Sequence, residues 1–354
     1  MTTEVPAYGK SDAGFRRLGS SLEPESADLG LNHTPVDRFF VCNAGSAPTL
    51  DRAQWRLRVG GDAVEREIEL TVDDLLELEQ VTVVSWLECA GNGRTLFNTV
   101  AGHDLSADPA NTPWTLGGLG LAVWTGPRLS SVIAPAKPMN VAAFVGPSGL
   151  DKNNPEGEPV RMCLPIEKAI HEDTIVALTM NGEPLEVAHG APARLLVAGW
   201  IGAYSVKWLD QIELSTSWID SYRANEYYVL RNPSGQIIGP ATTHPVKSQL
   251  RIKWDAHLPT GPIEIFGYAR SGVAPVTRVE WAIDGDEWQQ ATLLEDLGRW
   301  AWRPFVIHTE LGPGQHCIRT RATDESGDTQ PDIQPAHRDG ILWNAVIPHP
   351  VVVD

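Results

Sequence analysis

The stretch VTVVSWLECAGNGR, residues 81–94, joins a run of β-branched and large apolar residues to a loop rich in glycine. The run over 81–87 predicts a buried strand. The loop that follows it predicts a site, because glycine lets the backbone approach a ligand closely and such loops often carry functional side chains. This stretch therefore places the first candidate residues, Cys89 and Arg94, at a strand end.

Short predicted elements surround this stretch. A strand over 51–59 continues through a Gly60-Gly61 turn into a hairpin strand over 67–70, and Thr71 or Asp73 can cap a helix over 73–79. Further on we predict a helix at 165–170, a tight turn at Asn181-Gly182, and strands at 175–179, 194–198 and 205–214. Four evenly spaced strands, at 263–268, 277–283, 300–307 and 316–323, predict a terminal β-sandwich.

These patterns divide the chain into four parts. Residues 1–35, rich in Ser, Gly and Glu, form an N-terminal extension expected to lie on the surface, and residues 36–216 form a domain of mixed sheets and short helices. Residues 217–244 are interpreted as a linker, and residues 245–354 as an all-β, immunoglobulin-like sandwich. The predicted fold class is α+β.

Composition excludes several classes of function. The 354 residues carry 28 Lys and Arg against 45 Asp and Glu, a net charge of −17, so nucleic acid is not expected as a partner. No uncharged stretch is apolar enough for a membrane span, and no secretory signal is visible. We therefore expect a cytoplasmic protein, although a processed mature chain would look the same. The four cysteines form no C-x-x-C pair, which argues against a structural zinc site or a disulfide framework.

Two groups of residues could carry chemistry. Cys89, with Arg94 five residues on, could be a reactive or metal-binding thiolate, or simply a small buried hydrophobe. His189, Arg194 and Lys207 flank an apolar stretch over 195–203. Basic groups beside buried strands need an anionic partner, which is either an internal carboxylate, Asp210 or Glu213, or a bound phosphate.

Together these segments resemble the sulfite oxidase family of molybdenum enzymes, over roughly residues 36–345. The resemblance rests on SWLECAGNGR at 85–94, LPIEKAI at 164–170, MNGEPL at 180–185, and HGAPAR at 189–194 followed by GWIGAYSVKWL at 199–209. In the second half it rests on PVKS at 245–248, the segment from Gly267 to Asp284-Gly285 with Trp288, and the pairs Gln330-Pro331 and Trp343-Asn344.

The resemblance implies an oxidoreductase with one molybdenum and a single molybdopterin, in which Cys89 ligates the metal and Arg94 faces the substrate pocket. The implied cofactor-binding residues are Cys42, Asn43, Ala44, Cys89, Gly91, Asn92, His189, Arg194, Ser205, Val206 and Lys207. It also implies a homodimer formed through the sandwich domain. No C-x-x-C-H motif is present, so we expect no haem and a separate electron carrier.

Parts of the substrate cage of sulfite-oxidising members are missing. The family's F-x-R-N-H segment reads FVCNA at 40–44, so Cys42 replaces an arginine and Ala44 a histidine. A family tyrosine falls on Leu178, and a C-terminal arginine falls near Ala274, with Arg270 close enough to compensate. Because each hydrogen bond to an oxyanion contributes roughly 1.5–3 kcal/mol, we expect sulfite to be a poor substrate.

Several alternatives stay open. Cys42 is either a redox-active second thiol near the metal or a buried small residue. The reaction expected is transfer of one oxygen atom between water and a small substrate, such as an oxyanion, and the alternative is reduction of an S-oxide or N-oxide on the same fold. A non-catalytic binding module that keeps the fold is the competing class. A cysteine hydrolase lacks a histidine at a recognisable spacing, since His103 and His33 lie outside the motif.

Overall fold

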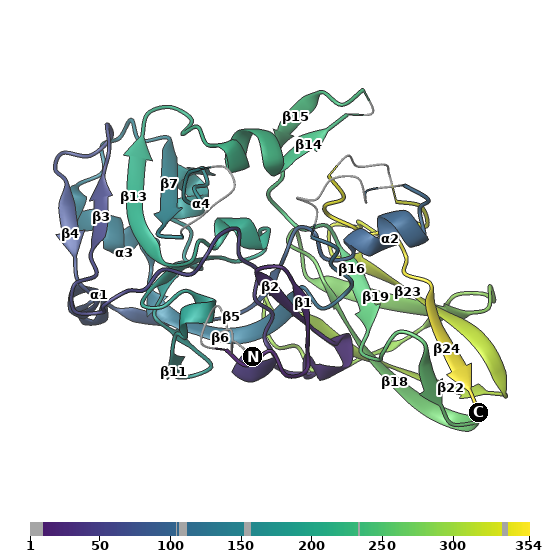
Figure 1. Cartoon of the computed structure of the whole chain (residues 1–354). Helices are drawn as coiled ribbons and strands as arrows, with labels where there is room; N and C mark the ends of the chain where they lie inside the picture. The colour runs from purple at the N-terminus through teal and green to yellow at the C-terminus, as the bar shows by residue number, and fades with distance from the viewer. Residues whose placement is uncertain (1–9, 104, 106–111, 152–156, 233, 335–338) are drawn as a thin grey trace.

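The computed structural model describes residues 10–103, 105, 112–151, 157–232, 234–334 and 339–354. Two β-rich units lie side by side, with the short strands β1 (Phe15–Leu18) and β2 (Ser21–Pro24) near their junction (Figure 1). None of the helices described is long and apolar enough to cross a bilayer.

The first unit is built on three sheets. A five-stranded mixed sheet has the order β4 (Ile68–Leu70), β3 (Leu57–Gly60), β13 (Leu209–Ser215), β7 (Phe144–Gly149) and β8 (Leu164–Pro165), in which only β3 and β13 run parallel. A four-stranded sheet has the order β11 (Glu183–Pro184), β10 (Thr179–Met180), β6 (Leu119–Pro127) and β5 (Gln80–Glu88), and β9 (Thr174–Ala177) pairs with β12 (Arg194–Val197). The five-stranded sheet and the β9–β12 pair share a core in which Leu57, Leu195 and Leu209 are fully buried. The four-stranded sheet packs against the β9–β12 pair in a second core that contains Val83, Trp124 and Leu196.

The helices are short. The α-helices are α1 (Val72–Glu77), α2 (Arg94–Thr99), α3 (Leu129–Ile133) and α4 (Ile166–Ala169). Single turns are η1 (Ser26–Asp28), η2 (Val36–Arg38), η3 (Ala134–Ala136), η4 (Val187–His189), η5 (Gly202–Tyr204) and the π-helical η6 (Arg223–Tyr227). As predicted, Thr71 caps α1, and it forms a capping box in which the Asp74 carboxylate accepts from the Thr71 backbone N–H.

The second unit is a β-sandwich, as predicted. One sheet has the order β16 (Lys247–Leu250), β18 (Gly261–Arg270), β22 (Arg303–Leu311) and β21 (Thr292–Leu293). The other has the order β17 (Ala256–Leu258), β24 (His349–Val353), β23 (Gly314–Asp324), β19 (Val276–Ile283) and β20 (Gln289–Gln290). Alternate residues of both sheets, such as Val279, Phe305 and Ile318, fill the space between them. The α+β fold class is thereby confirmed.

Two segments are more ordered than the sequence suggested. Residues 217–244, interpreted as a linker, contain η6 and the hairpin of β14 (Val229–Arg231) and β15 (Ile237–Pro240). In the N-terminal extension, the buried Glu23 carboxylate accepts hydrogen bonds from the backbone N–H groups of Thr115 and Gly117. A buried carboxylate that binds free N–H groups anchors its segment, so the strand β2 is held against residues 115–117 instead of fraying.

Candidate functional site

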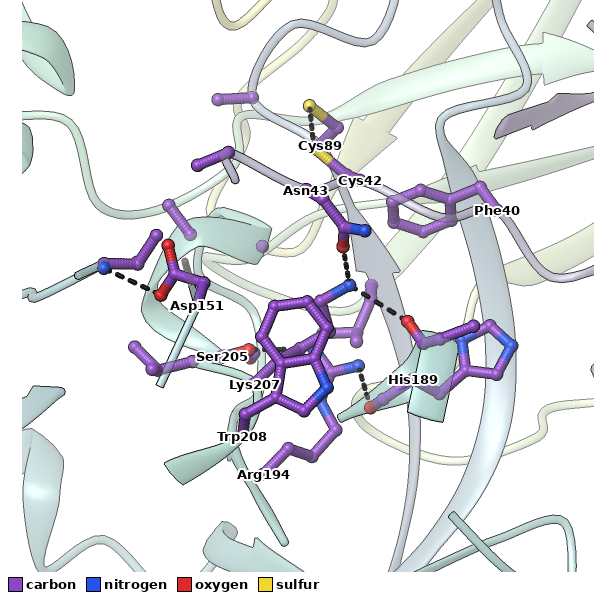
Figure 2. A pocket seen from close by; sticks show the side chains of 18 of the residues that line it. Phe40, Cys42, Asn43, Cys89, Asp151, His189, Arg194, Ser205, Lys207 and Trp208 are labelled. Atoms are coloured by element: carbon purple, nitrogen blue, oxygen red, sulfur yellow. Dashed lines mark hydrogen bonds between the residues drawn. The ribbon is translucent and has the colours of Figure 1, made fainter. Parts of the chain in front are cut away.

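A pocket with a cavity volume of about 90 Å3, open to solvent at its mouth, lies in the first unit (Figure 2). It gathers residues that are far apart in sequence: from the predicted cofactor set, Cys42, Asn43, Ala44, Cys89, His189, Arg194, Ser205, Val206 and Lys207 all line it. The predicted strand over 205–214 begins only at Leu209, because residues 205–208 leave the sheet and line this pocket instead.

Cys89 sits in a tight loop immediately after β5. Its backbone N–H donates to the carbonyl of Gly118 at 2.8 Å, and its own carbonyl accepts from the Asn92 N–H at 2.9 Å. Gly93 has φ +91°, a left-handed conformation that favours glycine, and starts α2. A Cβ there would lie 3.1 Å from the Cβ of Trp343. The glycine-rich loop therefore presents the thiol of Cys89 at the end of its strand.

A second thiol lies against the first. The Sγ atoms of Cys42 and Cys89 are 3.7 Å apart, and Figure 2 shows them facing each other at one end of the pocket. The hydrogen bond from Cys89 lowers the pKa of the Cys42 thiol to about 7. The same hydrogen bond, together with burial, raises the pKa of Cys89 well above its usual value. The contact between the two thiols therefore favours the loss of one proton from the pair.

The opposite part of the pocket is cationic. Lys207 Nζ donates to Asn43 Oδ1 and to the Ala188 carbonyl, and Arg194 donates to the carbonyls of His189 and Ser205. These partners are neutral oxygens, not carboxylates. The buried Asp151, also in the wall, has its pKa raised by burial.

Internal pairing with Asp210 or Glu213 does not occur. Asp210 binds Arg58, and Glu213 binds Arg161. That alternative is therefore wrong, and the charge of Lys207 and Arg194 is available to a ligand.

Burial makes the charged forms of these basic side chains less stable. Desolvation, followed by repulsion from Arg194, lowers the pKa of Lys207 to about 7, and desolvation lowers that of Arg194 to about 9. Burial and the nearby Lys10 keep the pKa of His189 well below its ordinary value. A bound anion would reverse these shifts, because an opposite charge favours the charged form of each base.

Three predicted residues lie outside the pocket wall: Gly91, Asn92 and Arg94. Asn92 instead bridges the loop, donating to Glu88 Oε1 at 2.8 Å and accepting from the Gly118 N–H at 3.0 Å. The Arg94 side chain is buried and donates to the carbonyls of Thr112, Asp339 and Gly340. Its part in the reaction remains a prediction.

The structure adds residues that we did not predict from the sequence. Arg223 and Tyr228 reach the wall from the segment interpreted as a linker, and Phe40, Asp151 and Trp208 also belong to it. Lys10, from the N-terminal segment, donates to the carbonyls of Val36 and Phe39, and its Nζ lies 3.0 Å from His189 Nε2. The signal for Arg223 was a lone cation among aromatic residues over 218–228. Lys10 gave no signal in the sequence.

Comparison with known proteins assigns the domain that contains this pocket to a protein family. The model of the oxidoreductase molybdopterin-binding domain matches residues 44–223, which hold most of the pocket wall. The chain belongs to the sulfite oxidase family of molybdopterin-dependent oxidoreductases. It is 31% identical over 334 residues to mitochondrial sulfite oxidase of Mus musculus, covering 88% of this chain and 60% of that protein.

Two further relatives broaden the family. An NADH nitrate reductase of Ulva prolifera is 30% identical over 356 residues, covering 88% of this chain and 39% of that protein. The crystal structure of the sulfane dehydrogenase SoxCD from Paracoccus pantotrophus superposes with a TM-score of 0.82 at 25% identity, covering 94% of this chain and 84% of that one. The chain thus spans less than two thirds of the length of the mouse protein and well under half of the algal protein.

The residues present fit a molybdopterin cofactor. Among the described residues, the buried Nε of Arg194 and Nδ2 of Asn43 have no hydrogen-bond partner, as expected of donors that await a ligand. The same part of the chain holds no group of three or more His, Cys, Asp or Glu side chains that could hold a metal. A metal beside Cys89 therefore needs ligands from a cofactor, and molybdopterin supplies sulfur ligands and a redox-active metal.

Proposed function

We propose that this chain is a molybdenum-dependent oxidoreductase that transfers an oxygen atom between water and a small substrate. One observation carries the proposal. A single pocket holds a thiol at one end and, at the other, a cluster of Lys207, Arg194 and His189 whose side chains form no ion pair with Asp210 or Glu213. This arrangement suits a cofactor that carries a phosphate at one end and a metal at the other.

Each end of the pocket has a distinct task in this proposal. The thiolate of Cys89 holds the metal, which would deprotonate the thiol outright and so reverse its raised pKa. Lys207 and Arg194 bind the phosphate as donors, and Asn43 orients Lys207 through its Oδ1. Neutral His189 accepts from Lys10, which keeps that ring fixed beside the phosphate site.

The substrate end is less cationic than in sulfite-oxidising members of the family. Cys42 stands where they have an arginine, and Leu178, in the place of their tyrosine, is 5% exposed and packs in the core. Arg270 lies outside the pocket wall, and its guanidinium binds Glu88, so it does not compensate for the arginine missing near Ala274. These observations support a substrate other than sulfite.

Arg223 and Tyr228 are two polar side chains of the pocket wall that interact electrostatically with the thiol pair. Arg223 lies near enough to Cys42 to stabilise its thiolate, which places a cation beside the thiol pair. We therefore propose that Arg223 binds the oxygen of a small substrate.

Metal analysis and steady-state kinetics test the proposal. Protein from a host that makes molybdopterin is expected to contain about one molybdenum per chain and to oxidise sulfite only at high concentration. Molybdenum-free protein with an intact fold would contradict the proposal and favour a binding module. Micromolar KM for sulfite would contradict the depleted substrate pocket.

A second candidate is reduction of a neutral S-oxide or N-oxide. The apolar wall near the thiols, Phe40, Leu87 and Ala90, favours a substrate without charge. Turnover of dimethyl sulfoxide or trimethylamine N-oxide with a reduced viologen dye would support it, and reaction with sulfite alone would exclude it.

Partners also remain proposals. Electrons would leave to a separate carrier, and the sandwich would form a homodimer in the cytoplasm, as the family resemblance implies. Light scattering on the purified chain tests the dimer directly, and a mass equal to one chain would reject it.

A further inference from the structure

The pocket holds a pair of thiols that face each other. All four cysteines are described, and the structure records a sulfur–sulfur contact between two of them, Cys42 and Cys89, at 3.7 Å. Cys163 is buried beside Ile219 and Ala224, and Cys317 lies on β23 in the sandwich. Cys42 occupies a position where the resemblance implies an arginine, so its thiol is not accounted for by phosphate or metal binding.

The surroundings of the pair allow a bond between the two sulfurs. A disulfide needs a sulfur separation near 2.05 Å, so the contact must close by roughly 1.6 Å. Cys42 lies outside the named strands, between the bridge residue Val41 and the loop at Asn43, where the backbone is less constrained than in a sheet. Cys42 is partly exposed while Cys89 is buried, so a reagent that enters the pocket meets Cys42 first.

We propose that Cys42 and Cys89 form a reversible disulfide in the cofactor-free protein. The oxidant is a peroxide such as hydrogen peroxide. The Cys42 thiolate attacks one peroxide oxygen, giving a sulfenic acid at Cys42 and hydroxide, which becomes water on protonation. The Cys89 sulfur then attacks the Cys42 sulfur, the S–O bond breaks, and the S–S bond forms as a second water leaves. Two thiols lose two electrons, and peroxide gains them.

This bond would exclude the metal. A sulfur in a disulfide is no longer a thiolate and cannot ligate a metal. If Cys89 is the metal ligand, as the proposed function requires, oxidation of the empty pocket prevents insertion of the cofactor, and reduction restores it. A bound metal, conversely, protects Cys89 from oxidation. Cys42 is then a modification site that controls access to the metal position.

Peptide mapping tests the disulfide without any cofactor. Apoprotein from a host that cannot make molybdopterin is treated with hydrogen peroxide, alkylated, and digested with trypsin without reductant. The expected product joins peptide 39–52, which contains Cys42, to peptide 67–94, which contains Cys89. Dithiothreitol should release both peptides. Recovery of the two peptides separately, both alkylated, after the oxidation would overturn the proposal.

Cysteine variants distinguish a specific Cys42–Cys89 disulfide from nonspecific oxidation of the cysteines. Cys163→Ser should give the same cross-link as the wild type, because Cys163 lies in a different cluster. Cys42→Ser and Cys42→Ala should give none, and two variants guard against one failing to fold. A cross-link that includes peptides of Cys163 or Cys317 in place of peptide 39–52 would also overturn the proposal.

A second arm tests the competition with the cofactor. Oxidised wild-type apoprotein should bind no molybdopterin in vitro until it is reduced. Cys42→Ser apoprotein should bind molybdopterin equally well before and after a peroxide treatment of a few minutes. Equal cross-linking in molybdenum-loaded and empty protein would overturn this competition. Absence of molybdenum from protein made in a host that produces molybdopterin would instead overturn the proposed function. The disulfide found by peptide mapping would not be affected by that result.

Discussion

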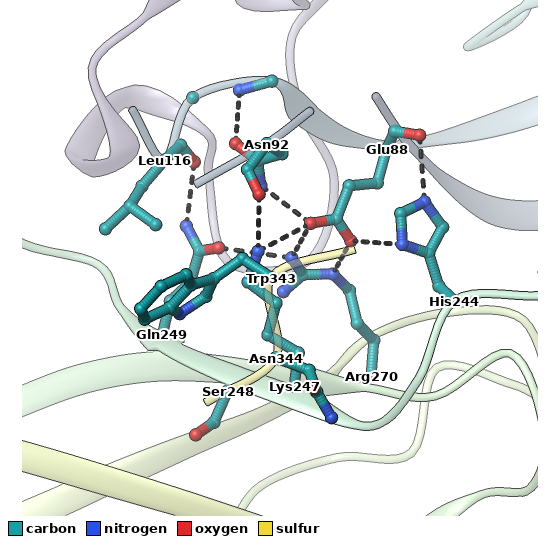
Figure 3. A network of polar contacts seen from close by, with 12 residues as sticks. Glu88, Asn92, Leu116, His244, Lys247, Ser248, Gln249, Arg270, Trp343 and Asn344 are labelled. Carbon is teal, nitrogen blue, oxygen red and sulfur yellow. Dashed lines mark hydrogen bonds and ion pairs between the residues drawn. The ribbon is translucent and has the colours of Figure 1, made fainter. Parts of the chain in front are cut away.

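Arg270, at the end of β18 in the sandwich, donates through Nε and Nη2 to the two carboxylate oxygens of Glu88 at 2.6 and 2.5 Å. Lys247 adds a third contact, to Glu88 Oε1 at 3.0 Å, and also donates to the carbonyl of Asn92 (Figure 3). Glu88 directly precedes Cys89. The sandwich therefore holds both ends of the loop that carries the candidate metal ligand.

All members of this network are buried, which sets its electrostatics. Burial alone would raise the pKa of Glu88, but Arg270, Lys247 and His244 together hold it well below its usual range. Burial lowers the pKa of His244 to about 4, so that ring is neutral at pH 7. One carboxylate therefore faces two cations, and this network leaves a net positive charge behind the cysteine loop.

Replacing Glu88 should destabilise the whole chain. Glu88→Gln leaves Arg270 and Lys247 buried without their counter-charge, and breaking a buried ion pair in this way costs roughly 3–5 kcal/mol. The midpoint of urea unfolding measures the effect. The matched control is Glu264→Gln, because Glu264 and His308 form an exposed pair 3.4 Å apart whose loss should change stability by less than about 1 kcal/mol. Equal effects of the two changes would rule out the network as a structural tie.

Removing the Cys89 thiol should separate metal binding from pterin binding. In Cys89→Ser the cationic cluster is intact, so the phosphate end of the cofactor keeps its partners while the metal loses its protein ligand. We expect the ratio of molybdenum to pterin to fall in elemental analysis, because the cofactor's own sulfur ligands alone then hold the metal, while fluorescence of oxidised pterin still reports retained cofactor. Cys163→Ser should keep both signals. Loss of pterin together with molybdenum would show that the metal bond, not the cluster, holds the cofactor.

Lys207 should matter for anion binding more than for folding. Lys207→Met removes a charge-assisted hydrogen bond of about 1.5–3 kcal/mol, equal to roughly 10- to 150-fold weaker cofactor binding. Because burial already disfavours its charge, the same change should leave the unfolding free energy unchanged or slightly higher. Cofactor retention during gel filtration and urea unfolding measure the two effects. Lys207→Arg, which keeps the charge, should recover part of the binding, and a large loss of stability in Lys207→Met would contradict this account.

Anion binding should weaken as pH rises above 7. In the empty pocket the pKa of Lys207 is about 7 and that of Lys10 about 8, and a bound anion raises both, so binding takes up protons in this window. Sulfate is a suitable probe because its charge is constant there. Its affinity for the apoprotein, followed by calorimetry, should fall by up to about tenfold per pH unit for each proton taken up. Lys207→Met should flatten the profile, and an affinity independent of pH in the wild type would refute the assignment.

Both ends of the pocket could be predicted in part from the sequence. The strand that ends at Glu88 and the loop after it follow from β-branched residues and glycines that are adjacent in the chain. The basic cluster also lay within one short segment, and a resemblance of motifs connected it to Cys89. Local patterns of this kind can be read from sequence because neighbouring residues alone produce them.

Contacts between distant segments decided the rest. The sequence did not show whether Lys207 pairs with Asp210, because closeness along the chain does not decide which way a side chain points. The register of the sheet places Asp210 beside Arg58 instead. Cys42 and Cys89 are 47 positions apart, yet their sulfurs meet. Arg223 enters the pocket from a segment whose weak pattern suggested a linker. The sequence itself thus determined the strands, the cysteine loop and the charge available near it, since these depend on local chemistry. Only the tertiary structure decided which charges stay without carboxylate partners and which thiols touch, since burial and pairing depend on the packing of remote segments.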